Sequence, residues 1–66
     1  MEVILNGKPQ VITDNQSVAE MIASLYDTDK GIAVAVNNTL VPRGKWEQHR
    51  LMPADDIVII KAAYGG

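Results

Sequence analysis

Residues 57–66 read IVIIKAAYGG. The first four are apolar and mostly β-branched, which is typical of a buried strand. The strand then passes into small residues, and the last two positions are Gly65 and Gly66. Glycine inside a fold usually permits an unusual backbone angle, but no turn remains to be made here. The two glycines therefore reflect chance, flexibility, or a partner that needs a slim chain end.

Length and composition indicate one small soluble domain. Sixty-six residues bury only about 60% of the surface that the unfolded chain exposes, so the margin of stability is small. The absence of cysteine excludes disulfides and thiolate metal sites. No apolar run approaches the roughly 18 residues of a membrane span, and the first residues lack the basic start of a signal peptide. We expect a cytoplasmic protein, monomeric when free, with no membrane partner.

The charge pattern argues against nucleic-acid binding. The net charge is −2 and the acidic residues are spread along the chain, whereas phosphate binding needs a basic stripe. One exception is RGKWEQHR at 43–50, where three basic residues surround Trp46. This segment is either a small nucleic-acid patch or a solvated loop whose Trp46 covers one end of the core. The acidic balance favours the loop, with a protein as partner.

The first residues predict a hairpin. A strand over residues 2–5 and a second over 8–13 flank Asn6-Gly7, a pair that tolerates the positive φ angles of a type I′ turn. Pro9 cannot donate a hydrogen bond to a neighbouring strand, so the second strand should lie at an edge of the sheet.

A capping box predicts where the helix begins. The Ser17 side chain can accept from the Glu20 amide while the Glu20 side chain reaches back to the Ser17 amide. The helix should extend to about Tyr26, before the turn-forming residues 27–31. Its apolar residues recur every three or four positions and so share one buried face: Val18, Met21, Ile22 and Leu25.

The second half predicts three more strands in a mixed α+β fold of about five strands, with one main helix on one face. The expected order is a strand at 32–36, a turn at 37–39, a brief strand at 40–41, an irregular segment at 43–52 with a helical turn near Trp46, a turn at 53–56 and the final strand. The branched side chains of the 32–36 strand should face the helix, with its alanines pointing away.

One helix can cover only one face of the sheet. If Ile57 and Ile59 face the helix, then Val58, Ile60 and Ala62 lie on the uncovered face. Small soluble domains seldom expose a contiguous apolar patch without a use for it. Either the loop at 42–52 partly covers this patch, or the patch is a docking surface that leads into the chain end.

Two motifs then point to a family. They are VNNTLVPR at 36–43 followed by Trp46, and the last strand running into Gly65-Gly66. Together with the order of elements, these motifs resemble those of the ubiquitin-like sulfur carriers, which have the β-grasp fold. The resemblance covers the whole chain and is greatest to the ThiS family of thiamine biosynthesis. MoaD-like carriers of molybdopterin synthase are usually longer and have prolines before the glycines, where this sequence has AAY at 62–64. The family commonly has Gly-Asp where Asp55-Asp56 stands here; aspartate tolerates left-handed geometry, so a turn is still expected.

The resemblance implies that Gly66 carries the chemistry. Its α-carboxylate is ionised near neutrality and would attack the α-phosphate of ATP on a ThiF-like adenylating enzyme that uses Mg²⁺ and ATP. A persulfide sulfur donor would then replace AMP and leave a thiocarboxylate. That sulfur would pass to a ThiG-like thiazole synthase. The chain itself is expected to bind no cofactor, because it lacks a phosphate-binding loop.

The tail at 62–66 is expected to be flexible, with a reach of at most about 17 Å. Gly65 would let a narrow tunnel close on the backbone. Tyr64 is either an anchor read by the partner or a side chain that packs against the body. The expected docking surface comprises Val58, Ile60, Ala62 and Arg43, with Lys45 assisting.

The sequence offers no catalytic constellation. His49 is the only histidine, and Asp55-Asp56 is better explained as a turn than as an acid–base pair. We therefore expect a substrate of enzymes and not an enzyme. The alternatives are a MoaD-like carrier for another sulfur acceptor, a non-covalent β-grasp interaction module, an RNA-binding β-grasp domain and, last, an independent enzyme.

Overall fold

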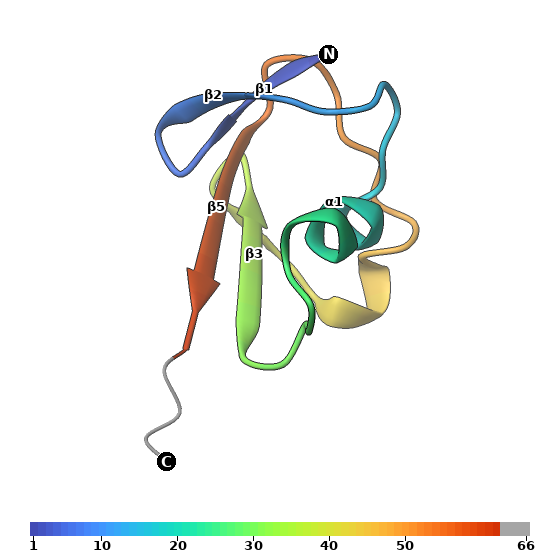
Figure 1. The fold of residues 1–66 in the computed structure, drawn as a ribbon, viewed down its shortest axis with the longest axis vertical. Helices are drawn as coiled ribbons and strands as arrows, with labels where there is room; N and C mark the ends of the chain where they lie inside the picture. Colours follow the sequence, from blue (N-terminus) through green and yellow to red (C-terminus); the bar gives the residue numbers. More distant parts are fainter. Residues whose placement is uncertain (63–66) are drawn as a thin grey trace.

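The computed structural model describes residues 1–62, which form a five-stranded sheet with one helix packed on one face (Figure 1). In chain order the elements are β1 (Glu2–Leu5), β2 (Lys8–Val11), α1 (Val18–Leu25), β3 (Ile32–Val36), β4 (Thr39–Val41), the 3₁₀ turn η1 (Arg43–Lys45) and β5 (Asp56–Lys61). The strand order is β2-β1-β5-β3-β4. Strand β5 is central, parallel to β1 and antiparallel to β3, so the predicted mixed α+β sheet is confirmed.

The predicted hairpin is present, and its second strand lies at the sheet edge as expected. Asn6 and Gly7 have φ angles of 49° and 82°, both positive as a type I′ turn requires. Pro9 lies opposite Ile4 on this edge strand. Strand β2 ends at Val11, two residues earlier than predicted, because the chain already turns at 13–16.

Asn6 also joins the hairpin to the central strand. Its backbone N–H donates to the Ile57 carbonyl (2.8 Å), and its side-chain Oδ1 accepts from the Ile59 N–H (2.8 Å). In a parallel ladder the backbone carbonyl of the same residue would accept this second bond. The positive φ of Asn6 turns its backbone into the hairpin instead, so the side chain takes the place of a strand carbonyl. No sequence pattern had indicated this role.

The capping box forms as predicted at the start of α1. Ser17 Oγ accepts from the Glu20 N–H (3.0 Å), and Glu20 Oε1 accepts from the Ser17 N–H (3.0 Å). Arg50 Nη1 lies 3.0 Å from the same carboxylate oxygen. These contacts lower the pKa of the Glu20 carboxyl, chiefly through the hydrogen bond from the Ser17 backbone and further through the Ser17 side chain and Arg50.

The core lies between α1 and the sheet. It comprises Val18, Met21 and Ile22 of the helix with the inward residues of the sheet and of the 41–51 segment: Val3, Ile32, Val34, Val36, Val41, Trp46, Leu51, Ile57 and Ile59. The expectation that Leu25 joins this buried face is wrong, because its side chain is 40% exposed. Leu25 instead lines a surface hollow together with Val11 and Ile12, at the edge of the sheet formed by β2.

The turn before β5 differs from the expectation. Positive φ falls on Ala54 (68°) and not on Asp55. The Asp55 N–H donates to the Met52 carbonyl (3.2 Å), so Ala54 occupies the third position of a four-residue turn, where type II geometry requires positive φ. Asp55 instead uses its carboxylate, which accepts from the Met52 N–H (2.8 Å) and from Asn37 Nδ2 (3.0 Å). Asp55 is therefore a turn residue as predicted, but it acts through the hydrogen bonds of its carboxylate and not through a left-handed backbone.

The lowered pKa of Glu20 makes part of the stability depend on pH. A carboxyl whose pKa is lower in the folded state stabilises the fold above its ordinary pKa and loses this contribution as the pH falls through the folded value. We expect Glu20→Gln to be less stable than the wild type at pH 7, with the difference shrinking below about pH 4.3. Urea unfolding from pH 7 to pH 3 measures it, with Glu47→Gln as control. A difference that stays constant over this range would contradict the assignment.

The Asn6 side chain can be tested without disturbing the turn. Asn6→Gly keeps the positive φ but removes the acceptor for the Ile59 N–H, and should lower the free energy of unfolding by about 1–2 kcal/mol. Asn6→Asp keeps an acceptor oxygen and should cost less. Chemical denaturation of both variants decides the matter, and equal losses would show that the side-chain bond contributes little.

Candidate functional site

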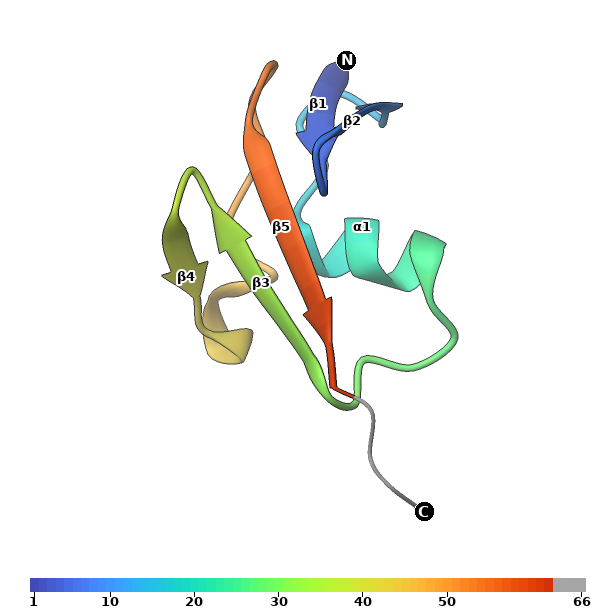
Figure 2. The ribbon, with the colours of Figure 1, turned by 90° about the vertical axis from the view of Figure 1, so that its left-hand side faces the viewer.

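The face of the sheet opposite α1 (Figure 2) carries several exposed apolar side chains on β4 and β5. Leu40 of β4 lies opposite Ala35 of β3, which lies opposite Val58 of β5; one step along, Ala33 lies opposite Ile60. Leu40 and Ile60 are 65% and 62% exposed, and Val58 is 39% exposed. We call these five residues the open face. The two alanines add little bulk, so its exposed area comes mainly from the three larger side chains.

The 42–52 segment borders the open face only at Leu40, which shares a hollow with Pro42 and Lys45; it leaves Ile60 exposed, so the expectation that it covers the β5 part of the patch is wrong. The segment packs on the helix side: the Val18 N–H donates to the His49 carbonyl (3.0 Å), and the Ala19 N–H donates to the Trp46 carbonyl (3.1 Å). Trp46 is buried, and its Nε1–H donates to the Val41 carbonyl (2.9 Å). The prediction that Trp46 closes one end of the core is confirmed.

The chain leaves the sheet at the end of β5. The Ala62 N–H donates to the Gly31 carbonyl (2.7 Å), one residue beyond the strand. Ala62 is exposed, and alternation places it on the side of Ile60. The predicted recognition residues Tyr64 and Gly65 and the predicted reactive Gly66 lie outside the described residues, as does most of the predicted tail.

Arg43 does not lie with Val58 and Ile60. Its guanidinium stands over the Trp46 ring at 5.2 Å from the ring centroid, and its Nη1 lies 3.5 Å from Asp29 Oδ2. The same side chain donates to the Asp29 carbonyl. Arg43 thus links the loop before β3 to the Trp46 segment on the helix side. Its predicted role in docking, like that of the exposed Lys45, stays a prediction.

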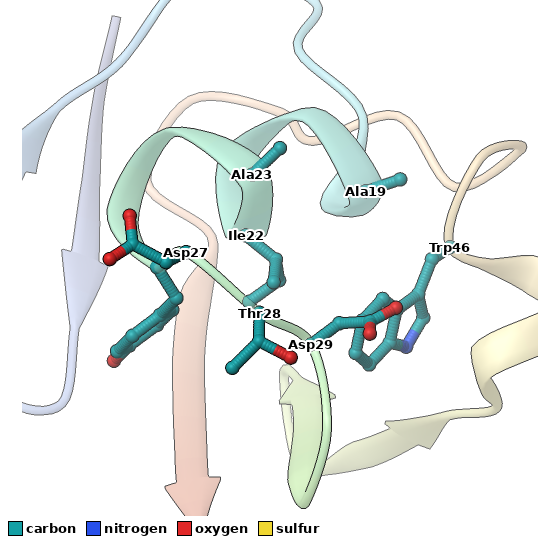
Figure 3. A pocket seen from close by; sticks show the side chains of 8 residues that line it. Ala19, Ile22, Ala23, Asp27, Thr28, Asp29 and Trp46 are labelled. Atoms are coloured by element: carbon teal, nitrogen blue, oxygen red, sulfur yellow. The ribbon is translucent and has the colours of Figure 1, made fainter.

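A hollow of about 370 Å³ lies between α1, the 27–29 loop and Trp46 (Figure 3). Its polar groups are Asp27, Thr28 and Asp29, with Asp29 toward Trp46 and Asp27 at the other end. No histidine, lysine or cysteine of residues 1–62 lines the hollow, so the Thr28 hydroxyl has no imidazole or amine beside it of the kind that activates a hydroxyl nucleophile. No sequence motif had indicated this hollow, because it arises where a helix end meets a distant loop.

Two further findings concern residues 1–62 alone. Their one α-helix has eight residues, too few to cross a membrane. No three metal-ligating side chains gather among them in a way that could hold a metal ion.

Comparisons with known proteins agree with this geometry. A family model described as the ThiS family matches residues 3–66. The sulfur carrier protein ThiS of Escherichia coli strain K12 is 30% identical over 66 residues, which is the whole of both chains. The crystal structure of the thiamine biosynthesis protein ThiS from Geobacter metallireducens has a TM-score of 0.85 at 20% identity over all of both chains. An NMR solution structure of a thiamine biosynthesis protein from the same organism has a TM-score of 0.80 at 20% identity, over this whole chain and 88% of the other.

A mixed five-stranded sheet around the central strand β5, with one helix on one face, defines the β-grasp class of fold, and the solved structures support this fold. The match over residues 3–66 and the full-length relative then place the chain in the ThiS family.

Proposed function

We propose that this chain is a sulfur carrier of thiamine biosynthesis that holds the sulfur as a thiocarboxylate on Gly66 and releases it for thiazole formation. The observation that carries the proposal is the course of β5 in a chain of the ThiS family. The central strand is the one nearest the chain end in sequence, and within residues 1–62 its final backbone contact is the bond from Ala62 to Gly31. The protein acts as a co-substrate of enzymes and is not itself a catalyst, in keeping with its family.

The proposed chemistry explains why the chain end is the reactive part. A carboxylate is a poor acyl donor, so an oxygen of the Gly66 carboxylate attacks the α-phosphate of ATP, and pyrophosphate leaves. The terminal sulfur of a persulfide then attacks the acyl carbon, and AMP leaves. A second thiol cleaves the resulting S–S bond by reduction, which leaves the sulfur on Gly66 as a thiocarboxylate. ATP and Mg²⁺ belong to the adenylating enzyme, and no step requires a base from this chain.

The open face is the proposed docking surface for the partner enzymes. Its residues are apolar, its larger side chains are exposed, and two of them belong to β5, the strand that precedes Gly66. Four residues beyond Ala62 can extend about 14 Å, so a body docked through Ile60 and Val58 could place the carboxylate inside a partner's active site. The proposed partners are a ThiF-like adenylating enzyme and a ThiG-like thiazole synthase. Burial of the open face would offset the entropy lost on ordering the tail.

The family match supports the thiazole branch over the MoaD-like alternative. It covers residues 3–66, the segment that contains both the VNNTLVPR motif and the glycines. A non-covalent interaction module would use the same open face but would tolerate the loss of Gly66, which makes the two functions separable by experiment.

Intact mass after incubation with ATP, a ThiF-like enzyme and a persulfide donor tests the carrier function. We expect a gain equal to the replacement of one oxygen by sulfur. A chain lacking Gly66 should gain nothing, whereas His49→Ala should gain the same mass as the wild type, because no base from this chain takes part. An unchanged wild-type mass, with an enzyme that activates another ThiS-family carrier, would rule the proposal out for this partner.

Replacement of one open-face residue tests docking. Ile60→Thr keeps the β-branched shape but removes apolar surface, and should weaken binding to the ThiF-like enzyme about three- to tenfold. Val11→Thr is the matched control, since Val11 is also exposed but lies on the outer strand β2. Isothermal titration measures both, with thermal unfolding to confirm that each variant folds. Equal weakening by the two variants would contradict a docking role for the open face.

A further inference from the structure

Two contacts hold the end of β5 and the residue that follows it. The Ala62 N–H donates to the Gly31 carbonyl (2.7 Å), and the Lys61 Nζ stands over the Tyr26 ring at 5.4 Å from its centroid. Tyr26 is the C-cap of α1, and Gly31 directly precedes β3. The end of β5 is therefore tied to both ends of the loop that joins helix and strand.

The position of Lys61 follows from the alternation of β5. Ile57 and Ile59 face the helix and are buried, and Lys61 is the next residue on that face. The core ends at this level, so the position suits a side chain with an apolar stem and a charged end. Tyr26 offers the face of an aromatic ring, which attracts a cation.

The helix provides a second reason for a cation here. The last turn of α1 contains no basic residue, although positive charge stabilises the carbonyl end of a helix. The ammonium group of Lys61 brings that charge from the other end of the chain, next to the C-cap residue. The contact thus links the helix terminus to the strand that leads into the tail.

We propose that Lys61 and Tyr26 act as a clamp that fixes where the tail leaves the sheet, and that they are positioning residues for the delivery of Gly66 to the adenylating enzyme. This inference rests on the proposed carrier function. Strand β1 ends at Leu5, and Asn6 makes its last bond to β5 at Ile59. Beyond that level β5 is held by β3 and by the clamp.

The clamp sets how much of the chain lies beyond its final hold on the sheet. With β5 held through Ala62, four residues follow, and their fully extended length is about 14 Å; if Lys61 and Ala62 detach, six residues follow, and the extended length is about 20 Å. Detachment of Lys61 and Ala62 adds two residues that must be ordered again, at a cost in entropy, when the chain end enters the partner. The clamp therefore lowers the carrier concentration needed for adenylation and leaves the chemical step unchanged.

A double-mutant cycle in carrier-dependent ATP–pyrophosphate exchange tests the clamp. Lys61→Met keeps the stem and removes the charge, and Tyr26→Leu removes the ring. Each should raise the KM for the carrier about three- to tenfold, with kcat nearly unchanged, and the double variant should be no worse than either single one. The conservative variants Lys61→Arg and Tyr26→Phe retain the contact and should remain near wild type.

Amide hydrogen exchange at Ala62 provides an independent readout in the free protein. Exchange should be faster in Lys61→Met and Tyr26→Leu and unchanged in the two conservative variants. Independent, multiplying effects on KM would overturn the clamp, because they would mean that the enzyme contacts Lys61 and Tyr26 separately. Wild-type KM in both single variants would also overturn it and leave the carrier function intact, whereas a wild-type chain that is not adenylated would overturn the carrier function itself.

Discussion

The fold depends on the way a short hairpin holds a long central strand. Strand β1 pairs with β5 at only two positions, Ile4 with Asp56 and Leu5 with Ile57, before the chain turns away. The side chain of Asn6 then accepts from the Ile59 N–H and extends the attachment by one step. Because β5 is held on that side, it can pair with β3 on the other and present alternate residues to the helix and to solvent. The core and the open face both follow from this arrangement.

The two faces of the sheet are covered to different extents. The helix and the segment around Trp46 pack on the same side, where the Arg43 contacts with Asp29 and Trp46 close the gap between two loops. Both segments that could cover the sheet, α1 and the segment around Trp46, therefore lie on the same face. The other face keeps small and branched apolar side chains exposed, and this is the surface proposed above for docking.

Local patterns were sufficient to predict most of the fold. Period-two alternation gave the two faces of β5, the Asn-Gly pair gave the hairpin turn, and the capping box gave the start of α1. The features that were missed join residues far apart in the sequence, such as Asn6 with Ile59 or Lys61 with Tyr26. These contacts form only when the fold brings the two residues together, so local sequence patterns do not report them. The positive φ of Ala54 was missed because alanine does not signal it, and the exposure of Leu25 because helical periodicity does not report where a sheet ends.

The direction of β5 also has a mechanical consequence. The strand pairs with β3 over five residue pairs, from Ile32–Lys61 to Val36–Ile57, and its Lys61 end is the one nearer the chain end in sequence. A pull on the chain end therefore acts parallel to the strand, and the load is shared by the whole ladder instead of opening it one bond at a time. Such a pull is opposed first by the β3–β5 ladder, which has more residue pairs than any other ladder of the sheet. Resistance to such a pull is set by the rate of unfolding rather than by equilibrium stability.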